Sequence, residues 1–296
     1  MKHAFLIIAH NEYPILEVLL SMLDDERNYI YLHIDKRAVA LYQKIKGFKT
    51  KKAGFYLIEK SIKVYWGDIS LVKAEYLLFE TALKNGTYVY YHLLSGTDLP
   101  IKSQDYIHEF FHKNSGKEFV GFWQNAAHQR DLERKVFRYY FFTQRLKDKG
   151  NLLHEITSLI RNAVLALHKI SNYRRKTTFE FKKGGQWVSI TENAVSYLLQ
   201  YKSTILKRMK YTLCPDEIFI QTLLWNSPFR EKMYCINDAN IGCMRDIDWE
   251  RGNPYIWQNS DYKRLVDSNK IFARKFHSKQ MQVVHEIQKS YSKQHT

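Results

Sequence analysis

Short apolar runs alternate with amphipathic helical segments over the first hundred residues. The runs "AFLIIAH" (4–10) and "YIYLHID" (29–35) are rich in β-forming residues, and "PILEVLLSML" between them has its apolar residues at helical spacing. The pattern repeats: "SLVKAEYLLFETALK" (70–84) predicts a helix, and "YVYYHLL" (88–94) predicts the strand after it. Strands that alternate with helices form a mostly parallel sheet that helices cover on both faces. The predicted fold class is therefore α/β.

Two further strand candidates, "GFYLIE" (54–59) and "KVYW" (63–66), lie between these units. After residue 120 the alternation loosens, but no repeat, low-complexity tract or linker interrupts the chain. We expect one α/β unit over residues 1–296. Ligands of such sheets bind beyond the carboxyl ends of the strands. Two polar segments, "HIDKR" (33–37) and "LSGTDLPIKS" (94–103), are predicted at those ends.

The formal net charge of +16 is the strongest compositional signal. A basic protein favours anionic partners, which are nucleotides, nucleic acids or an anionic membrane face. Residues 130–185 hold fourteen Lys or Arg against five Asp or Glu, an excess of nine. The three cysteines, Cys214, Cys235 and Cys243, form no CxxC pair. They favour a reducing compartment and give no support to a zinc site.

The segment "LLHEITSLIRNAVLALHKI" (152–170) places its apolar residues along one helical stripe. Such a stripe is typical of a helix packed on a hydrophobic core. The alternative is a membrane-surface helix that binds anionic lipid, because the basic string "NYRRK" (172–176) follows it. The apolar run at the N-terminus is too short for a membrane span and reads as the first strand.

Several common catalytic motifs are absent from the sequence: the Walker phosphate loop, GxGxxG, GxSxG and HExxH. Basic residues and lone carboxylates at strand and helix ends remain, a combination suited to a phosphate-bearing substrate. The string "DID" (246–248) resembles a metal-binding DxD, but it lies far along the chain from the first strands. After the strand at 88–94 the chain carries only Asp98, and a single carboxylate is a poor Mg²⁺ or Mn²⁺ site.

Two consecutive acids follow a proline in "CPDEIFIQTLLWNS" (214–227). Pro215 suits a first helical position, so a helix is predicted to begin there. Asp216 and Glu217 then fall in its first turn, where acids complement the helix dipole. Consecutive helical residues point about 100° apart, so these acids cannot face each other as a catalytic pair. If one of them acts chemically, it acts alone.

Eight sequence blocks together resemble the core-2/I-branching β-1,6-N-acetylglucosaminyltransferase and peptide O-xylosyltransferase family. They occur in the family's order from residue 4 to about residue 277, so the resemblance covers the whole chain. The blocks are "FLIIAHNE", "YLHIDKR", "VYWGDISLVKAEYLL", "LLSGTDLPIKS", "GGQWVSIT", "PDEIFIQTLLWNS", "RDIDWERGNPYIW" and "NKIFARKF".

This resemblance implies a GT-A fold with a Rossmann-like sheet and an inverting, metal-independent sugar transfer from a UDP-sugar. The family's catalytic base falls on Glu217, which leaves Asp216 a structural role. The diphosphate-binding cations fall on Arg245 and Lys275, and the uridine ligand on Asp35. Trp187 matches the acceptor side. No metal or other cofactor is implied.

Three cations in the poorly matching stretch, Arg134, Lys135 and Arg138, are further candidates for contact with sugar or phosphate. Residues 1–120 are expected to bind the nucleotide sugar, and residues 121–296 to bind the acceptor and carry catalysis. Animal members have an N-terminal anchor and many cysteines, whereas this chain shows neither. We therefore expect a bacterial cytoplasmic enzyme, held at the inner membrane face if its basic helix binds lipid.

The donor predicted first is UDP-N-acetylglucosamine, with UDP-xylose or UDP-galactose or galactofuranose as alternatives. The predicted acceptor is a glycan or a lipid-linked oligosaccharide. A basic nucleic-acid-binding protein is the alternative from another class, but the sequence carries no RRM, KH or helix-turn-helix signature, so nucleic acid is not an expected partner. A glycosidase needs two facing carboxyls, which consecutive acids cannot supply.

Overall fold

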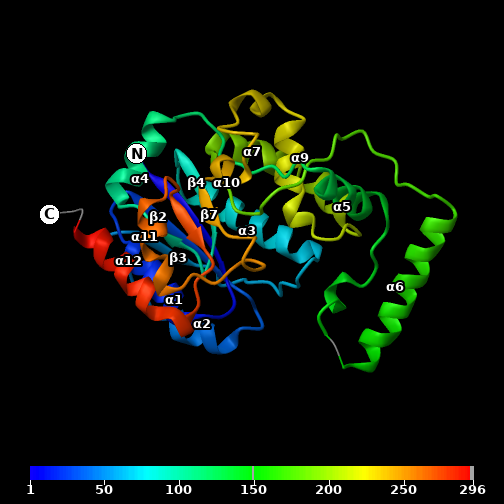
Figure 1. Cartoon of the computed structure of the whole chain (residues 1–296), viewed down its shortest axis with the longest axis horizontal. Coiled ribbons are helices and arrows are strands. Elements are labelled where there is room, and N and C mark those ends of the chain that lie inside the picture. Colours follow the sequence, from blue (N-terminus) through cyan, green and yellow to red (C-terminus); the bar gives the residue numbers. More distant parts are fainter. Residues whose placement is uncertain (149, 294–296) are drawn as a thin grey trace.

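The computed structural model describes residues 1–148 and 150–293 and centres on a five-stranded sheet (Figure 1). Its strand order is β3-β2-β1-β4-β6, and every neighbouring pair is parallel except β4 with β6. This topology confirms the expected α/β class with a mostly parallel sheet flanked by helices. The strands are β1 (His3–Ala9), β2 (Asn28–Ile34), β3 (Gly54–Leu57), β4 (Tyr90–Ser95) and β6 (Ser189–Thr191).

Helices cover both faces of this sheet and bury most residues of its central strands. All seven residues of β1 are buried. Alternate residues of this strand enter two separate cores, with Leu6 and Ile8 on one side and Phe5 and Ile7 on the other. Residues of α3, α7 and α9 complete the first core, and residues of α1, α4 and α12 complete the second. A continuous apolar run such as "AFLIIA" is the expected sequence of a strand buried on both faces.

The helices of the described chain vary from single turns to the nineteen residues of α6. Those before residue 150 are α1 (Tyr13–Met22), α2 (Val39–Ile45), α3 (Ile69–Asn85), α4 (Gln104–Lys113) and α5 (Ala126–Phe137). Those after it are α6 (Leu152–Ile170), α7 (Glu192–Gln200), α8 (Lys202–Met209), α9 (Phe219–Trp225), α10 (Ala239–Cys243), α11 (Tyr262–Asp267) and α12 (Met281–Lys293).

A second, three-stranded sheet joins the end of the chain to its first half. Strand β8 (Phe272–Arg274) lies between β5 (Leu99–Pro100), to which it is antiparallel, and β7 (Arg245–Ile247), to which it is parallel. Because β5 follows β4 after a short turn, this pairing carries the residues after β8 to the carboxyl end of the main sheet.

The expected strand at 63–66 is wrong. The backbone N–H groups of this region donate to side chains and not to a neighbouring strand: Ile62 to His33 Nε2, Val64 to Asp35 and Tyr65 to Ser70. The chain therefore runs as an irregular segment past the ends of β1 and β2, which a β-forming composition alone does not reveal.

The helix expected from Pro215 begins differently. Pro215–Glu217 form a 3₁₀ turn, Ile218 departs from helical geometry with φ −128°, and α9 starts at Phe219. The two acids consequently lie in a turn ahead of the α-helix, so their positions are fixed by local packing more than by the α9 dipole.

Candidate active site

A cavity of about 500 Å³ opens where β1, β2 and β4 reach their carboxyl ends. Its lining begins with His10 after β1, Asp35 after β2 and Ser95 at the end of β4. Segments distant in sequence complete it, including Trp187 and the pair Arg274 and Lys275. Three of the site residues predicted from the sequence, Asp35, Trp187 and Lys275, therefore share one cavity.

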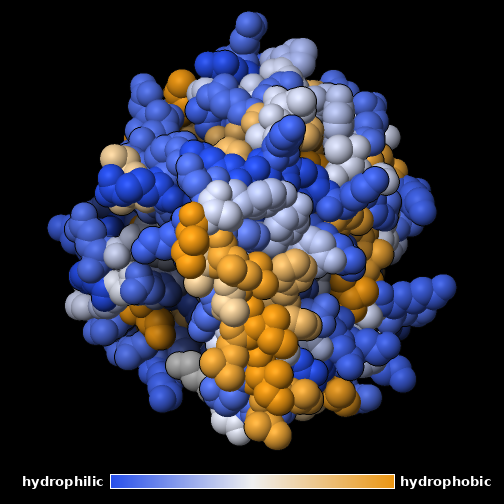
Figure 2. Space-filling model, turned by 90° about the vertical axis from the view of Figure 1, so that its right-hand side faces the viewer, coloured by the Kyte–Doolittle hydropathy of each residue, from blue (hydrophilic) through white to orange (hydrophobic). Residues whose placement is uncertain are grey.

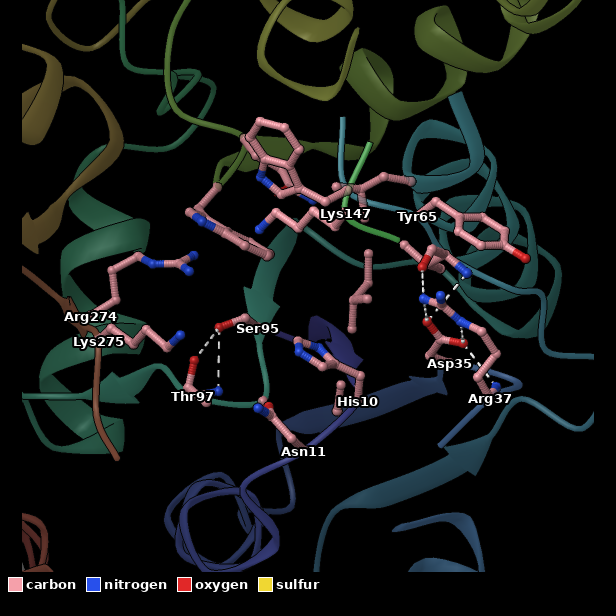
Figure 3. A pocket seen from close by; sticks show the side chains of 18 of the residues that line it. His10, Asn11, Asp35, Arg37, Tyr65, Ser95, Thr97, Lys147, Arg274 and Lys275 are labelled. Carbon is pink, nitrogen blue, oxygen red and sulfur yellow. Dashed lines mark hydrogen bonds and ion pairs between the residues drawn. The ribbon is translucent and has the colours of Figure 1, made fainter. Parts of the chain in front are cut away.

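One end of the cavity is built around Asp35 (Figure 3). Its carboxylate accepts hydrogen bonds from the Arg37 backbone N–H at 2.8 Å, from the Arg37 guanidinium at 2.7 Å and from Val64 N–H at 3.3 Å. Burial acts to raise the pKa of Asp35, but the Arg37 bonds outweigh it and the pKa is lowered. The Arg37 guanidinium lies over the Tyr65 ring at 4.3 Å. Sequence reasoning did not single out Arg37 or Tyr65, although Arg37 stands two residues after Asp35.

The opposite end of the cavity is cationic (Figure 3). Arg274 and Lys275 follow one another at the end of β8, and the Arg274 guanidinium lies over the Trp187 ring at 4.3 Å. Asp98 is the acid nearest to Arg274, at 3.6 Å, but it already accepts hydrogen bonds from the backbone N–H and the hydroxyl of Ser95. The Arg274 Nε–H has no hydrogen-bond partner among the described residues. A ligand with several anionic oxygens suits such a pair of cations.

Polar side chains line the floor between the two ends. His10 and Asn11 follow β1, and Thr97 lies in the turn after β4 (Figure 3). Burial lowers the pKa of His10, so its imidazole is neutral at neutral pH. Lys147 adds a further cation from the segment before α6. None of these four residues was singled out from the sequence.

Glu217 does not line the cavity but lies in a charged cluster beside it. Its carboxylate is 3.0 Å from Lys135 Nζ and 3.4 Å from Lys183 Nζ, and both lysine side chains are less than a tenth exposed. Asp131 contacts the same two lysines and also Arg134. Burial acts to raise the pKa of Asp131, but hydrogen bonds from Lys183, Arg134 and Lys135 outweigh it and hold this pKa well below its usual range. The Glu217 side chain keeps 27% of its surface exposed.

Main-chain hydrogen bonds hold the Glu217 turn against the cavity wall. The Glu217 carbonyl accepts from Gly184 N–H at 2.9 Å, two residues before Gln186 of the lining. At the other side of the turn, Cys214 N–H donates to the Gly67 carbonyl at 3.0 Å, next to Trp66 of the lining. A Cβ on Gly184 would lie 1.8 Å from the Gly121 carbonyl oxygen, so glycine is required for this close approach.

The two consecutive acids occupy opposite environments. Asp216 is buried, and its Oδ1 has no hydrogen-bond partner among the described residues. Burial, followed by the nearby charge of Glu217, raises the pKa of Asp216 to about 7. Glu75 is also fully buried near Asp216, and it accepts a hydrogen bond from Gln186 at 2.7 Å. Of the pair, only Glu217 is exposed enough to meet a substrate.

The predicted site residue Arg245 lies inside the protein, away from the cavity. It is only 1% exposed, and it is absent from the cavity lining. Its guanidinium donates to the carbonyls of Cys243 and Val188 and to the Ser189 hydroxyl. It therefore joins β6 to β7 inside the protein. A guanidinium enclosed in this way does not reach the cavity, whereas Arg274 lines it.

The candidates Arg134, on α5, and Arg138, directly after it, also lie outside the cavity lining. Arg134 contacts the Glu217 cluster through Asp131, at 2.6 Å. Within residues 1–148 and 150–293, no group of three or more His, Cys, Asp or Glu is arranged to hold a metal ion. Both acids of "DID" pair with Arg264 away from the cavity.

The sequence matches the family model described as Branch, Core-2/I-Branching enzyme, over residues 3–293. The chain belongs to this family. The family resemblance inferred from the eight blocks is thereby confirmed, and a sugar transferase is the class of function that the family supports.

Named relatives of the Core-2/I-Branching chain include xylosyltransferases. Xylosyltransferase 2 of Rattus norvegicus is 25% identical over 308 residues, which cover 97% of this chain and 33% of the relative. Xylosyltransferase oxt of Drosophila pseudoobscura pseudoobscura is 25% identical over 279 residues, 87% of this chain and 29% of the relative. The chain thus spans about a third of the length of these relatives. Among solved structures, the apo form of mouse xyloside xylosyltransferase 1 aligns at a TM-score of 0.40 with 10% identity, covering 92% of this chain and 96% of that one.

Proposed function

We propose that this protein is an inverting, metal-independent glycosyltransferase of the GT-A type. It transfers a sugar, with N-acetylglucosamine as the first candidate, from a UDP-sugar to a glycan or lipid-linked oligosaccharide. The observation that carries the proposal is the cavity at the strand ends, which has Asp35, Arg37 and Tyr65 at one end and Arg274 and Lys275 at the other. The first end suits a nucleoside, and the second suits its diphosphate.

The reaction needs one base and a set of cations. The Glu217 carboxylate takes the proton of an acceptor hydroxyl, whose oxygen attacks the anomeric carbon from the face opposite UDP. The bond from that carbon to the diphosphate breaks, and UDP leaves with the electron pair. Arg274 and Lys275 stabilise the negative charge that develops on the diphosphate, and loss of one such donor lowers rates by about 10²–10³.

The lysines around Glu217 argue against a glycosidase. Asp131 and Glu217 share Lys135 and Lys183, so this pair of carboxylates is neutralised by two ammonium groups. Glycoside hydrolysis requires one member of such a pair to carry a proton at working pH. The lowered pKa of Asp131 prevents it from acting as that acid.

UDP release by the purified protein tests the proposal. We expect release with UDP-N-acetylglucosamine and a glycan acceptor that persists in EDTA. UDP-xylose is the second donor to test, because the named relatives are xylosyltransferases. Activity that chelator removes and Mn²⁺ restores would refute metal independence. Tight oligonucleotide binding that weakens steeply with salt, without any UDP release, would favour the nucleic-acid alternative.

The base is tested by Glu217→Gln. Turnover should fall by about 10²–10⁴-fold, the usual contribution of a general base, while UDP affinity stays unchanged. Glu133→Gln is the matched control, because Glu133 lies in α5 near the same cluster but forms its ion pair with Arg174, on the protein surface. Equal turnover of Glu217→Gln and wild type would remove Glu217 from the base role.

A further inference from the structure

Helix α6 turns its apolar side away from the protein. Its buried residues are Thr157 and Arg161, and Arg161 donates to the Ser158 hydroxyl at 3.1 Å. The apolar residues form the exposed stripe that runs along this helix in Figure 2. The expectation that the stripe packs on the core is therefore wrong. The stripe comprises Leu152, Leu153, Ile156, Leu159, Ile160, Leu167 and Ile170.

The exposure of this stripe is large for a surface helix. Leu152 is 74% exposed, Leu159 71% and Ile170 82%. Helix α6 also lies at the margin of the molecule, beyond α5 (Figure 1). A contiguous apolar surface of this kind, rimmed by polar residues, marks a site for another protein or for a membrane. Its exposure to water has a free-energy cost that burial in a partner would remove.

The charge around the stripe selects between these two partners. Residues 130–185 carry the excess of nine positive charges, and exposed Lys169, Arg174 and Lys176 lie at the C-terminal end of α6. A symmetric contact through α6 would bring two such positive regions together, which costs electrostatic energy. An anionic bilayer instead attracts each surface cation while its interface accepts leucine and isoleucine side chains.

We propose that α6 docks in the plane of an anionic membrane surface. The exposed stripe enters the boundary between headgroups and acyl chains, and the neighbouring cations contact lipid phosphates. No helix of the described chain is long and apolar enough to cross a membrane, so the contact is peripheral. Gln144, Lys147 and Asp148 line the cavity and directly precede α6, so docking brings the cavity mouth close to the headgroups. The proposal does not depend on the sugar-transfer reaction.

Flotation of the full chain with lipid vesicles tests the docking. The protein should float with phosphatidylcholine vesicles that contain phosphatidylglycerol and much less with phosphatidylcholine alone. The double variant Leu159→Gln, Leu167→Gln should lower the partition coefficient by about a hundredfold, roughly tenfold for each leucine. The matched control is Val39→Gln, because Val39 is 61% exposed but lies on α2. It should float like the wild type.

A second double variant, Lys169→Gln with Lys176→Gln, isolates the charge contribution. It should weaken binding to anionic vesicles and leave binding to neutral vesicles unchanged. Circular dichroism melts confirm that each variant is folded, since all the substituted side chains are exposed. Failure of the wild type to float, or flotation of the leucine variant equal to wild type, would overturn the proposal. The proposal would also be overturned if the wild type does not bind vesicles and sedimentation velocity shows a dimer that the leucine substitutions dissociate.

Discussion

Asp216 should make the stability of this protein fall as the pH rises from about 4 to about 7. Its pKa is about 7 in the folded protein and near 4 in an unfolded chain. Between these two pH values, Asp216 is therefore protonated in the folded state and deprotonated in the unfolded state. Each pH unit in that window lowers the free energy of unfolding by about 1.4 kcal/mol, which gives a total on the order of 4 kcal/mol. The stability is complete below about pH 4 and lost above about pH 7.

Asp216→Asn preserves the side-chain volume and removes the titration. Urea unfolding followed by tryptophan fluorescence, repeated from about pH 4 to pH 8, gives the free energy of unfolding of each protein. The free energies of unfolding at different pH values are compared within each protein, so any pH-independent effect of the substitution cancels. The loss across the window should be smaller in the variant by several kcal/mol. Glu250→Gln, which removes an exposed acid, should behave like wild type. Parallel curves for wild type and Asp216→Asn would refute the reasoning.

Three other results are expected. Lys275→Ala should weaken UDP binding, measured by calorimetry, about 10- to 100-fold, because one charge-assisted contact is lost. Lys263 is exposed, and Lys263→Ala should leave the affinity unchanged. Equal affinities of Lys275→Ala and wild type would contradict the role of Lys275. Gly184→Ala should lower the free energy of unfolding by about 3 kcal/mol and should also lower turnover, because the added Cβ would clash with the Gly121 carbonyl. A Cβ added at Gly47 has no atom within 4 Å, so Gly47→Ala should have little effect. Burial lowers the pKa of His33 to about 4, so the contribution of His33 to stability, opposite in sign to that of Asp216, should be lost as the pH falls from about 6.5 to 4; urea unfolding of His33→Gln over this range should lack this contribution.

The sequence predicts the parts of the fold that local patterns determine. Strands β1, β2 and β4 follow apolar runs bounded by polar residues, and α3 (Ile69–Asn85) coincides within one residue at each end with the helix predicted over 70–84. The strand predicted at 63–66 does not form, because backbone N–H groups of this segment donate to the side chains of Asp35 and Ser70, partners that only the tertiary structure supplies. Such tertiary interactions commonly override β-propensity.

The candidate site shows the same division. Asp35 and Lys275 both line the cavity, Asp35 because it follows a strand of the α/β sheet and Lys275 because the pairing of β8 with β5 carries it there. Arg245 does not line the cavity. Nothing in the residues around it indicates that its guanidinium donates to the carbonyls of Cys243 and Val188. For α6, periodicity predicts a stripe but not the direction in which the stripe points.

The pairing of β8 with β5 has a consequence for how the protein is made. The Asp35 end of the cavity lies early in the chain, but Arg274 and Lys275 follow Asp35 by 239 and 240 residues. A nascent polypeptide on the ribosome, or one cut before residue 272, therefore has half of a binding cavity and no cationic end. Capture of a ligand by both ends of the cavity therefore requires a chain that extends past Lys275.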